Sequence, residues 1–179
     1  MKKETDLQLV MDEYTDLLFR IAYYYTKDKL IAEDIVQEVF VKFYYSEHYE
    51  EQNKLRAYLT KMTANQSKDY LKSWAYQKIK LTEKLPFALS KDTHEINYAS
   101  TPLEDAVLAL PVKFKEVITY YYYEGFSIKE IAQIVKVNEN TIKSRMKKAK
   151  ALLREMVGQS EEVRMLEQVT NETLRTNEG

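Results

Sequence analysis

The residues most able to do chemistry in this chain are cations at helical spacing towards its C-terminal end. Residues 141–154 contain six lysines and arginines and no acidic residue. Four of these cations have offsets of 4, 7 and 11, which places them on one face of a helix: Lys143, Lys147, Lys150 and Arg154. A cationic helix face can neutralise the phosphates of duplex DNA, although such a face can also simply be solvated.

The segment in front of this helix supports the first interpretation. Ser127 and Glu130 have the spacing of a capping box, Asn138 can cap the next helix, and Ala132 is small enough for two helices to cross closely. This pattern predicts a helix-turn-helix from Ser127 to about Arg154, whose second helix enters the major groove. Cations there bind phosphates and polar residues near the helix start reach base edges. The candidate contacts are Asn138, Asn140, Thr141, Lys143, Ser144, Arg145, Lys147 and Lys148.

A second basic block, residues 54–80, has aromatic residues interleaved among its lysines. Cations combined with flat rings are what single-stranded nucleic acid requires. The aromatic residues are Tyr58, Tyr70, Trp74 and Tyr76. The alternative is that the tyrosines belong to a core and Trp74 covers a hydrophobic edge. Residues 4–53, in contrast, are mostly acidic, so the net charge of −1 conceals a strongly segregated charge distribution.

The acidic segment contains a cluster on one predicted helix face, formed by Glu33, Asp34, Gln37 and Glu38. No histidine accompanies it, because the only two are His48 and His94, so a solvated or partner-binding face is favoured over a metal site. The chain has no cysteine, no Gly-rich phosphate loop and no triad pattern. We therefore expect no catalytic residues, no cofactor and no metal.

Three glycines and three prolines in 179 residues favour long helices, so we expect an all-α fold. Apolar spacing predicts helices over Leu7–Tyr25 and Ile31–Phe43, a polar loop, and a third helix that begins near Lys54. Periodicity is lost in the region of Pro86, which indicates a linker. Beyond it we expect a short helix over 103–110, a helix from Pro111 that ends at Gly125, and then the helix-turn-helix. The acidic tail is expected to be disordered or a single frayed helix.

Two stretches resemble extracytoplasmic-function (group 4) sigma factors of the bacterial sigma-70 family. Residues 32–40, AEDIVQEVF, are similar to the helix by which that family binds core polymerase. The segments 110–111, 124–132 and 141–149 are similar to its promoter −35 domain. The resemblance covers about residues 7–157, with both motifs in the family's order, which makes it highly specific.

The resemblance implies two small helical domains, a sigma region 2 bundle and a sigma region 4 helix-turn-helix, on a flexible linker. The expected boundaries are 1–78 for region 2, 79–102 for the linker, 103–157 for region 4 and 158–179 for the tail. The region 2 face expected to bind core polymerase is Asp34, Gln37 and Glu38. The expected contacts to the melted −10 strand are Tyr49, Tyr58, Lys61, Asn65, Lys68, Lys72 and Trp74, of which Tyr49 and Asn65 match by position the residues that hold a flipped base.

The implied partners are core RNA polymerase, through the clamp of its largest subunit and the flap of the second, promoter DNA, and an anti-sigma factor. No apolar run is long enough to span or insert into a membrane, so we expect a cytoplasmic protein. The resemblance implies that this protein is nucleoid-associated when active or held at the membrane by an anti-sigma factor. Two other functions fit parts of the pattern: a stand-alone helix-turn-helix regulator of duplex operators, and a polymerase-binding regulator that does not bind DNA.

The chain departs from the family pattern in the turn of the helix-turn-helix. Lys136 occupies the usual glycine position, which is a strained site for a side chain if φ is positive there. The stretch 138–140, Asn-Glu-Asn, replaces a frequent Pro-x-Gly. In region 2, Tyr58 replaces a common tryptophan and Lys61 an arginine.

Overall fold

The computed structural model describes residues 2–46, 54–84, 101–166 and 168. All regular secondary structure within these ranges is helical, which confirms the expected all-α class. The chain divides into two compact units, residues 1–96 and 97–179. No helix within the described ranges is long and apolar enough to cross a membrane.

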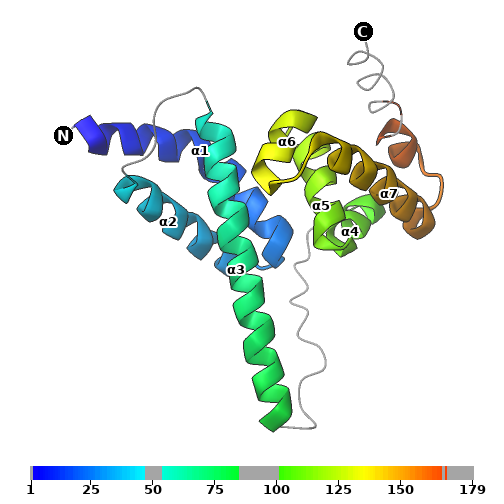
Figure 1. Ribbon diagram of the computed structural model, residues 1–179, viewed down its shortest axis with the longest axis horizontal. Helices are drawn as coiled ribbons and strands as arrows, with labels where there is room; N and C mark the ends of the chain where they lie inside the picture. The colour runs from blue at the N-terminus through cyan, green and yellow to red at the C-terminus, as the bar shows by residue number, and fades with distance from the viewer. Residues whose placement is uncertain (1, 47–53, 85–100, 167, 169–179) are drawn as a thin grey trace. The chain divides into compact units, whose positions relative to one another are not determined.

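The N-terminal unit is a bundle of three helices, α1 (Lys2–Thr26), α2 (Lys29–Tyr45) and α3 (Leu55–Lys84). Each of the three packs against the other two (Figure 1). The predicted apolar stripes form the core, whose fully buried members include Leu18, Ile21, Val39 and Leu59. Between α1 and α2 the chain turns at Lys27, whose φ is 54°, and Asp28 then caps α2 by accepting a hydrogen bond of 3.1 Å from the Ile31 N–H.

Helix α3 is longer than the sequence predicts. The predicted linker begins at residue 79, but α3 continues to Lys84, and its C-terminal half projects beyond α1 and α2 (Figure 1). Residues 79–84 lack an apolar period but contain no glycine or proline, so nothing in them stops a helix that has already started. Residues 85–100 of the predicted linker lie outside the described residues.

The C-terminal unit contains α4 (Pro102–Ala109), α5 (Val112–Ile118), α6 (Ile128–Val135) and α7 (Glu139–Val157). Helix α7 packs against the other three, and its apolar stripe is fully buried at Ile142, Ala149 and Leu153. The predicted helix from Pro111 is present as two consecutive segments, since α5 continues directly into a π-helical segment, η1 (Thr119–Tyr123). Gly125 follows with φ 69°, the left-handed conformation for which a glycine stop is suited.

The beginning of the predicted tail is folded onto the C-terminal unit. Residues 161–166 are helical, and Val163 is only 2% exposed. The hydroxyl of Tyr122 in η1 donates a 2.6 Å hydrogen bond to the carbonyl oxygen of Leu166. The next residue of η1, Tyr123, has a raised pKa, mainly because it is partly buried and also because the carboxylates of Glu104 and Glu162 are near. This part of the tail is therefore an additional packed helix, whereas the sequence favoured disorder or fraying.

Candidate nucleic-acid and partner interfaces

The first helix of the predicted helix-turn-helix, α6, begins as a capping box. Ser127 Oγ accepts a hydrogen bond of 3.2 Å from the Glu130 N–H, and the Glu130 carboxylate accepts one of 2.8 Å from the Ser127 N–H. Two backbone donors that a helix start leaves without partners are thereby satisfied. Ala132, the small residue expected where the two helices cross, is buried, with 8% of its surface exposed. The prediction of a capped helix at Ser127 is confirmed.

The turn between α6 and α7 is made by a lysine in a left-handed conformation. Lys136 has φ 58° and ψ 49°. The next backbone N–H, that of Val137, donates a hydrogen bond of 3.1 Å to the carbonyl oxygen of Ala132. The backbone thus forms the turn that glycine would favour, and the lysine side chain is exposed. An L-residue in this conformation costs about 1–2 kcal/mol, so the turn is locally strained.

Asn138 caps α7 as predicted, with its side-chain oxygen 2.8 Å from the N–H of Thr141 and 2.9 Å from its hydroxyl. The Asn138 oxygen and the Thr141 hydroxyl therefore support the helix start. Asn140 has no such role in the described contacts and is exposed at the first turn of α7. Glu139 is the first residue of α7, where a negative charge interacts favourably with the helix dipole.

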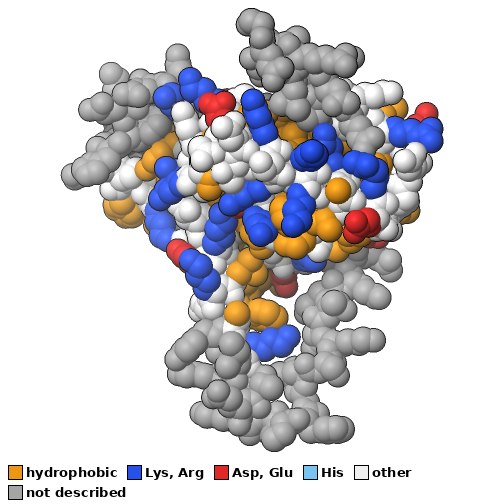
Figure 2. Space-filling view, turned by 45° about the vertical axis from the view of Figure 1, so that its right-hand side comes forward, with side chains coloured by type: hydrophobic (Ala, Val, Ile, Leu, Met, Phe, Trp, Pro, Cys, Tyr) orange, Lys and Arg blue, Asp and Glu red, His pale blue; other side chains and the backbone are white. Residues whose placement is uncertain are grey.

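The predicted DNA-contacting residues of α7 lie around the side opposite its buried stripe. Lys143, Ser144, Lys147 and Lys148 are exposed, whereas Arg145, at the edge of the buried stripe, is half-buried. Lys148 also places its amino group 5.9 Å from the centre of the Phe114 ring. Figure 2 shows a face on which Lys and Arg side chains are abundant and acidic ones are few. A helix of this shape and charge fits the major groove of duplex DNA.

In the N-terminal unit, four of the predicted −10 contacts form one row on α3. Lys61, Asn65, Lys68 and Lys72 follow one another at helical spacing. Asn65 and Lys72 are exposed and the other two are half-buried. Lys68 lies over the ring of Tyr25 at 5.8 Å, and Lys72 is 3.8 Å from the carboxylate of Asp69.

The predicted aromatic contacts are divided, because Tyr58 continues this row three residues before Lys61, whereas Trp74 does not lie on it. Tyr58 is half-buried, with its ring 6.4 Å from that of Phe43. Trp74 is 50% exposed, but it follows Lys72 by two residues and so lies about 200° further around α3. Its ring has the amino group of Lys78 at 4.9 Å. Tyr49 lies outside the described residues.

Asp34, Gln37 and Glu38, the predicted polymerase-binding residues, are all exposed on α2. Glu38 also contacts the neighbouring helix, because the side-chain amide of Gln66 in α3 donates a hydrogen bond to the Glu38 carboxylate. The oxygen of the same amide accepts a hydrogen bond from the amino group of Lys42. Sequence reasoning missed Gln66, since nothing local to α3 shows which α2 residues it faces.

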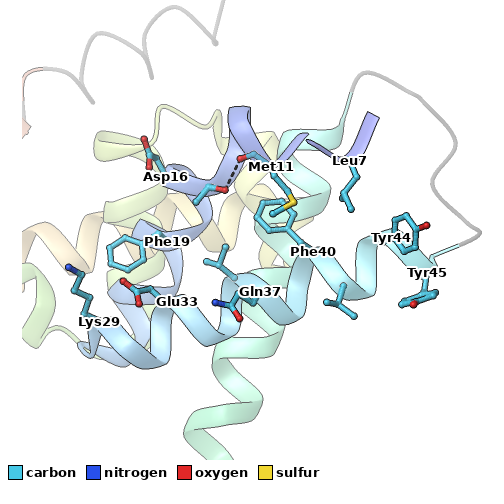
Figure 3. Close-up of a pocket in the computed structure, with 13 residues that line it drawn as sticks. Leu7, Met11, Asp16, Phe19, Lys29, Glu33, Gln37, Phe40, Tyr44 and Tyr45 are labelled. Carbon is cyan, nitrogen blue, oxygen red and sulfur yellow. Dashed lines mark hydrogen bonds between the residues drawn. The ribbon is translucent and has the colours of Figure 1, made fainter. Parts of the chain in front are cut away.

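An apolar groove of about 940 Å³ runs between α1 and α2 beside this acidic face. Figure 3 shows Met11, Phe19 and Phe40 along it and Tyr44 and Tyr45 at one end. Glu33 and Gln37 border it, so the groove and the predicted polymerase-binding residues form one continuous surface. The only local sequence signal for this groove is the aromatic run at the end of α2, which by itself does not indicate a groove.

Comparison with known proteins matches each unit to a family model. Residues 10–75 match "Sigma-70 region 2" and residues 100–153 match "Sigma-70, region 4". The chain is 31% identical to RNA polymerase sigma factor SigV of Bacillus subtilis over 86% of this chain and 93% of that protein. It is 25% identical to ECF RNA polymerase sigma factor SigM of the same organism, over 79% and 88%. Among solved structures, the sigma factor RpoE in complex with the anti-sigma factor NepR from Bartonella quintana matches with TM-score 0.70 at 23% identity, over 87% of this chain and 98% of that one.

Proposed function

The chain belongs to the extracytoplasmic-function sigma factors of the sigma-70 family, which direct promoter-specific transcription initiation, and from this premise we propose how its residues divide that task. The C-terminal unit binds the −35 element as duplex and the N-terminal unit holds core polymerase and the melted −10 strand. The single observation that carries this division is the segregation of charge into two basic surfaces and one acidic surface, each on a different helix face.

Helix α7 lies in the major groove of the −35 element. Asn140, Ser144 and Lys147, opposite its buried stripe, contact base edges, because they are exposed in the N-terminal half of the helix. The flanking cations Lys143 and Lys148 bind phosphates on either side. Asn138, Thr141 and the half-buried Arg145 are at the edge of this surface, where they support the helix start and contact the DNA backbone.

The row of Lys61, Asn65, Lys68 and Lys72 on α3 follows the melted −10 strand. Its lysines neutralise phosphates, and Asn65 is exposed with a donor and an acceptor for the edge of an extruded base. Trp74 is on the other side of α3, where its exposed ring can stack with a base on a separate part of the DNA. Tyr49 is proposed as the aromatic partner of the extruded base, and Tyr58 as support for the row.

Core polymerase binds the surface formed by Asp34, Gln37 and Glu38 together with the apolar groove between α1 and α2. Carboxylates beside an apolar groove fit a helical partner that carries both cations and apolar side chains. We propose that the clamp of the largest subunit is this partner, and that the flap of the second subunit contacts the C-terminal unit.

The chain itself is not an enzyme; it supplies promoter specificity to the polymerase. It acts in the cytoplasm, at the nucleoid when active. The structural relative from Bartonella quintana is in complex with an anti-sigma factor, and we propose that a corresponding partner, one that can be membrane-bound, restrains this chain. The acidic surface and groove of the N-terminal unit are available for such a partner to compete with polymerase.

Run-off transcription with purified core polymerase tests the proposal. Core and the full chain together should initiate at promoters that neither component uses alone. If the chain alone binds duplex operators tightly but directs no transcript, it is a stand-alone helix-turn-helix regulator. If it binds polymerase and the charge reversal of Lys143 and Arg145 changes nothing, it regulates polymerase without binding DNA.

A further inference from the structure

Gln66 connects the acidic face of α2 to α3 through both ends of its side-chain amide. Its nitrogen donates a hydrogen bond to Glu38, and its oxygen accepts one from Lys42. Glu38 and Lys42 are four residues apart on α2, which places them one above the other on the same face. The amide therefore lies where a carboxylate and an ammonium group approach each other.

We propose that Gln66 is a positioning residue for polymerase binding, acting through Glu38. Its N–H holds the Glu38 carboxylate in one orientation, and its oxygen engages Lys42, which would otherwise pair with Glu38 at this helical spacing. Glu38 thus presents a charge that is oriented but not neutralised to a cationic partner surface. The inference rests on the proposed role of the α2 face in binding core polymerase.

Only a neutral side chain with both a donor and an acceptor can make both contacts. A leucine at position 66 makes neither. A glutamate can still accept from Lys42, but it cannot donate to Glu38 and it places a second negative charge beside it. Orienting a long, exposed carboxylate before binding lowers the conformational entropy that is lost when the partner binds. Fixing one long side chain before the partner binds corresponds to about a twofold to tenfold difference in affinity.

The test is a double-mutant cycle on the affinity of the full chain for purified core polymerase, measured by competition with a fluorescently labelled copy. We expect Gln66→Leu to weaken binding about fivefold and Gln66→Glu to weaken it about tenfold. In a Glu38→Ala background the effect of Gln66→Leu should fall below about twofold, because its target is gone. The matched control is Gln77→Leu, on the same helix and exposed, which should bind like the unmodified chain.

Either of two results would overturn the inference, and only the first would also overturn the proposed polymerase-binding surface. If Glu38→Ala leaves the affinity for core polymerase unchanged, the α2 face does not bind polymerase, and the proposed surface fails together with the role of Gln66. If Glu38→Ala weakens binding but Gln66→Leu costs the same with and without Glu38, the surface stands and Gln66 is a structural contact only. A lowered unfolding midpoint for Gln66→Leu would accompany the second result.

Discussion

Replacing Lys136 by glycine should stabilise the C-terminal unit. At φ 58° and ψ 49° a lysine is strained by about 1–2 kcal/mol, and a glycine is not. Glycine also gives the unfolded chain more freedom, which costs about 0.4–1 kcal/mol. The Lys136 side chain is exposed, so its loss removes little packing. From the middle of these two ranges, the net gain in the free energy of unfolding is about 0.8 kcal/mol, or roughly 3–6 °C in the midpoint for a domain of this size.

The assay is thermal unfolding of the full chain followed by two signals. Trp74, the only tryptophan, reports the N-terminal unit by fluorescence, whereas far-UV circular dichroism reports both units. Lys136→Gly should raise the midpoint of the dichroism transition that has no fluorescence counterpart. Lys27→Gly, at the other left-handed lysine, with φ 54°, should instead raise the fluorescence midpoint.

Lys136→Ala separates backbone strain from charge, because it removes the amino group but keeps a Cβ atom at positive φ. Its midpoint should stay close to that of the unmodified chain. If Lys136→Gly unfolds at the same temperature as Lys136→Ala, or below it, the strain argument is wrong. Duplex binding by Lys136→Gly should stay within about twofold, since the turn already has the conformation that glycine favours.

Three further variants test the interfaces and the tail. Reversing charge at Lys143 and Arg145 together should abolish −35 duplex binding in gel-shift assays. Neutral substitutions there should lower the slope of log binding constant against log salt concentration by about 1 for each phosphate that is no longer neutralised. An unchanged slope would show that these α7 residues do not contact the DNA. Trp74→Ala should weaken binding of single-stranded promoter DNA by about 1–3 kcal/mol in fluorescence titrations if its exposed ring stacks on a base, and equal affinity would show that it does not. Val163→Asp should lower the unfolding free energy of the C-terminal unit by about 2 kcal/mol or more, because a charge replaces a side chain that is 2% exposed; no change would mean that the tail helix is not packed in solution.

Features that depend on residues close in sequence were predictable. Ser127 and Glu130, and Asn138 with Thr141, satisfy backbone donors within a single turn, so their spacing alone identified two helix starts. The buried stripe of α7 followed from periodicity in the same way. The cationic residues opposite that stripe could therefore be placed on an exposed face without knowledge of the fold.

Features that depend on how helices cross were not predictable. Gln66 and Glu38 are separated by 28 residues and meet only because α2 and α3 pack together. Val163 belongs to a weakly patterned tail, and its burial depends on where that tail folds back. The end of α3 was misplaced for a different reason: loss of apolar spacing marks the end of a packed face, whereas a helix can continue into solvent without one.

If the two units recognise two separate promoter elements, mapping transcript starts after overexpression should detect both elements in one experiment. With the unmodified chain, the newly used start sites should share two upstream sequence elements at a fixed spacing, centred near −35 and −10. With Lys143 and Arg145 reversed in charge, starts that depend on the −35 element should disappear. New starts without a shared −35 sequence, or an unchanged set of starts in that variant, would show that the C-terminal unit does not recognise a −35 element.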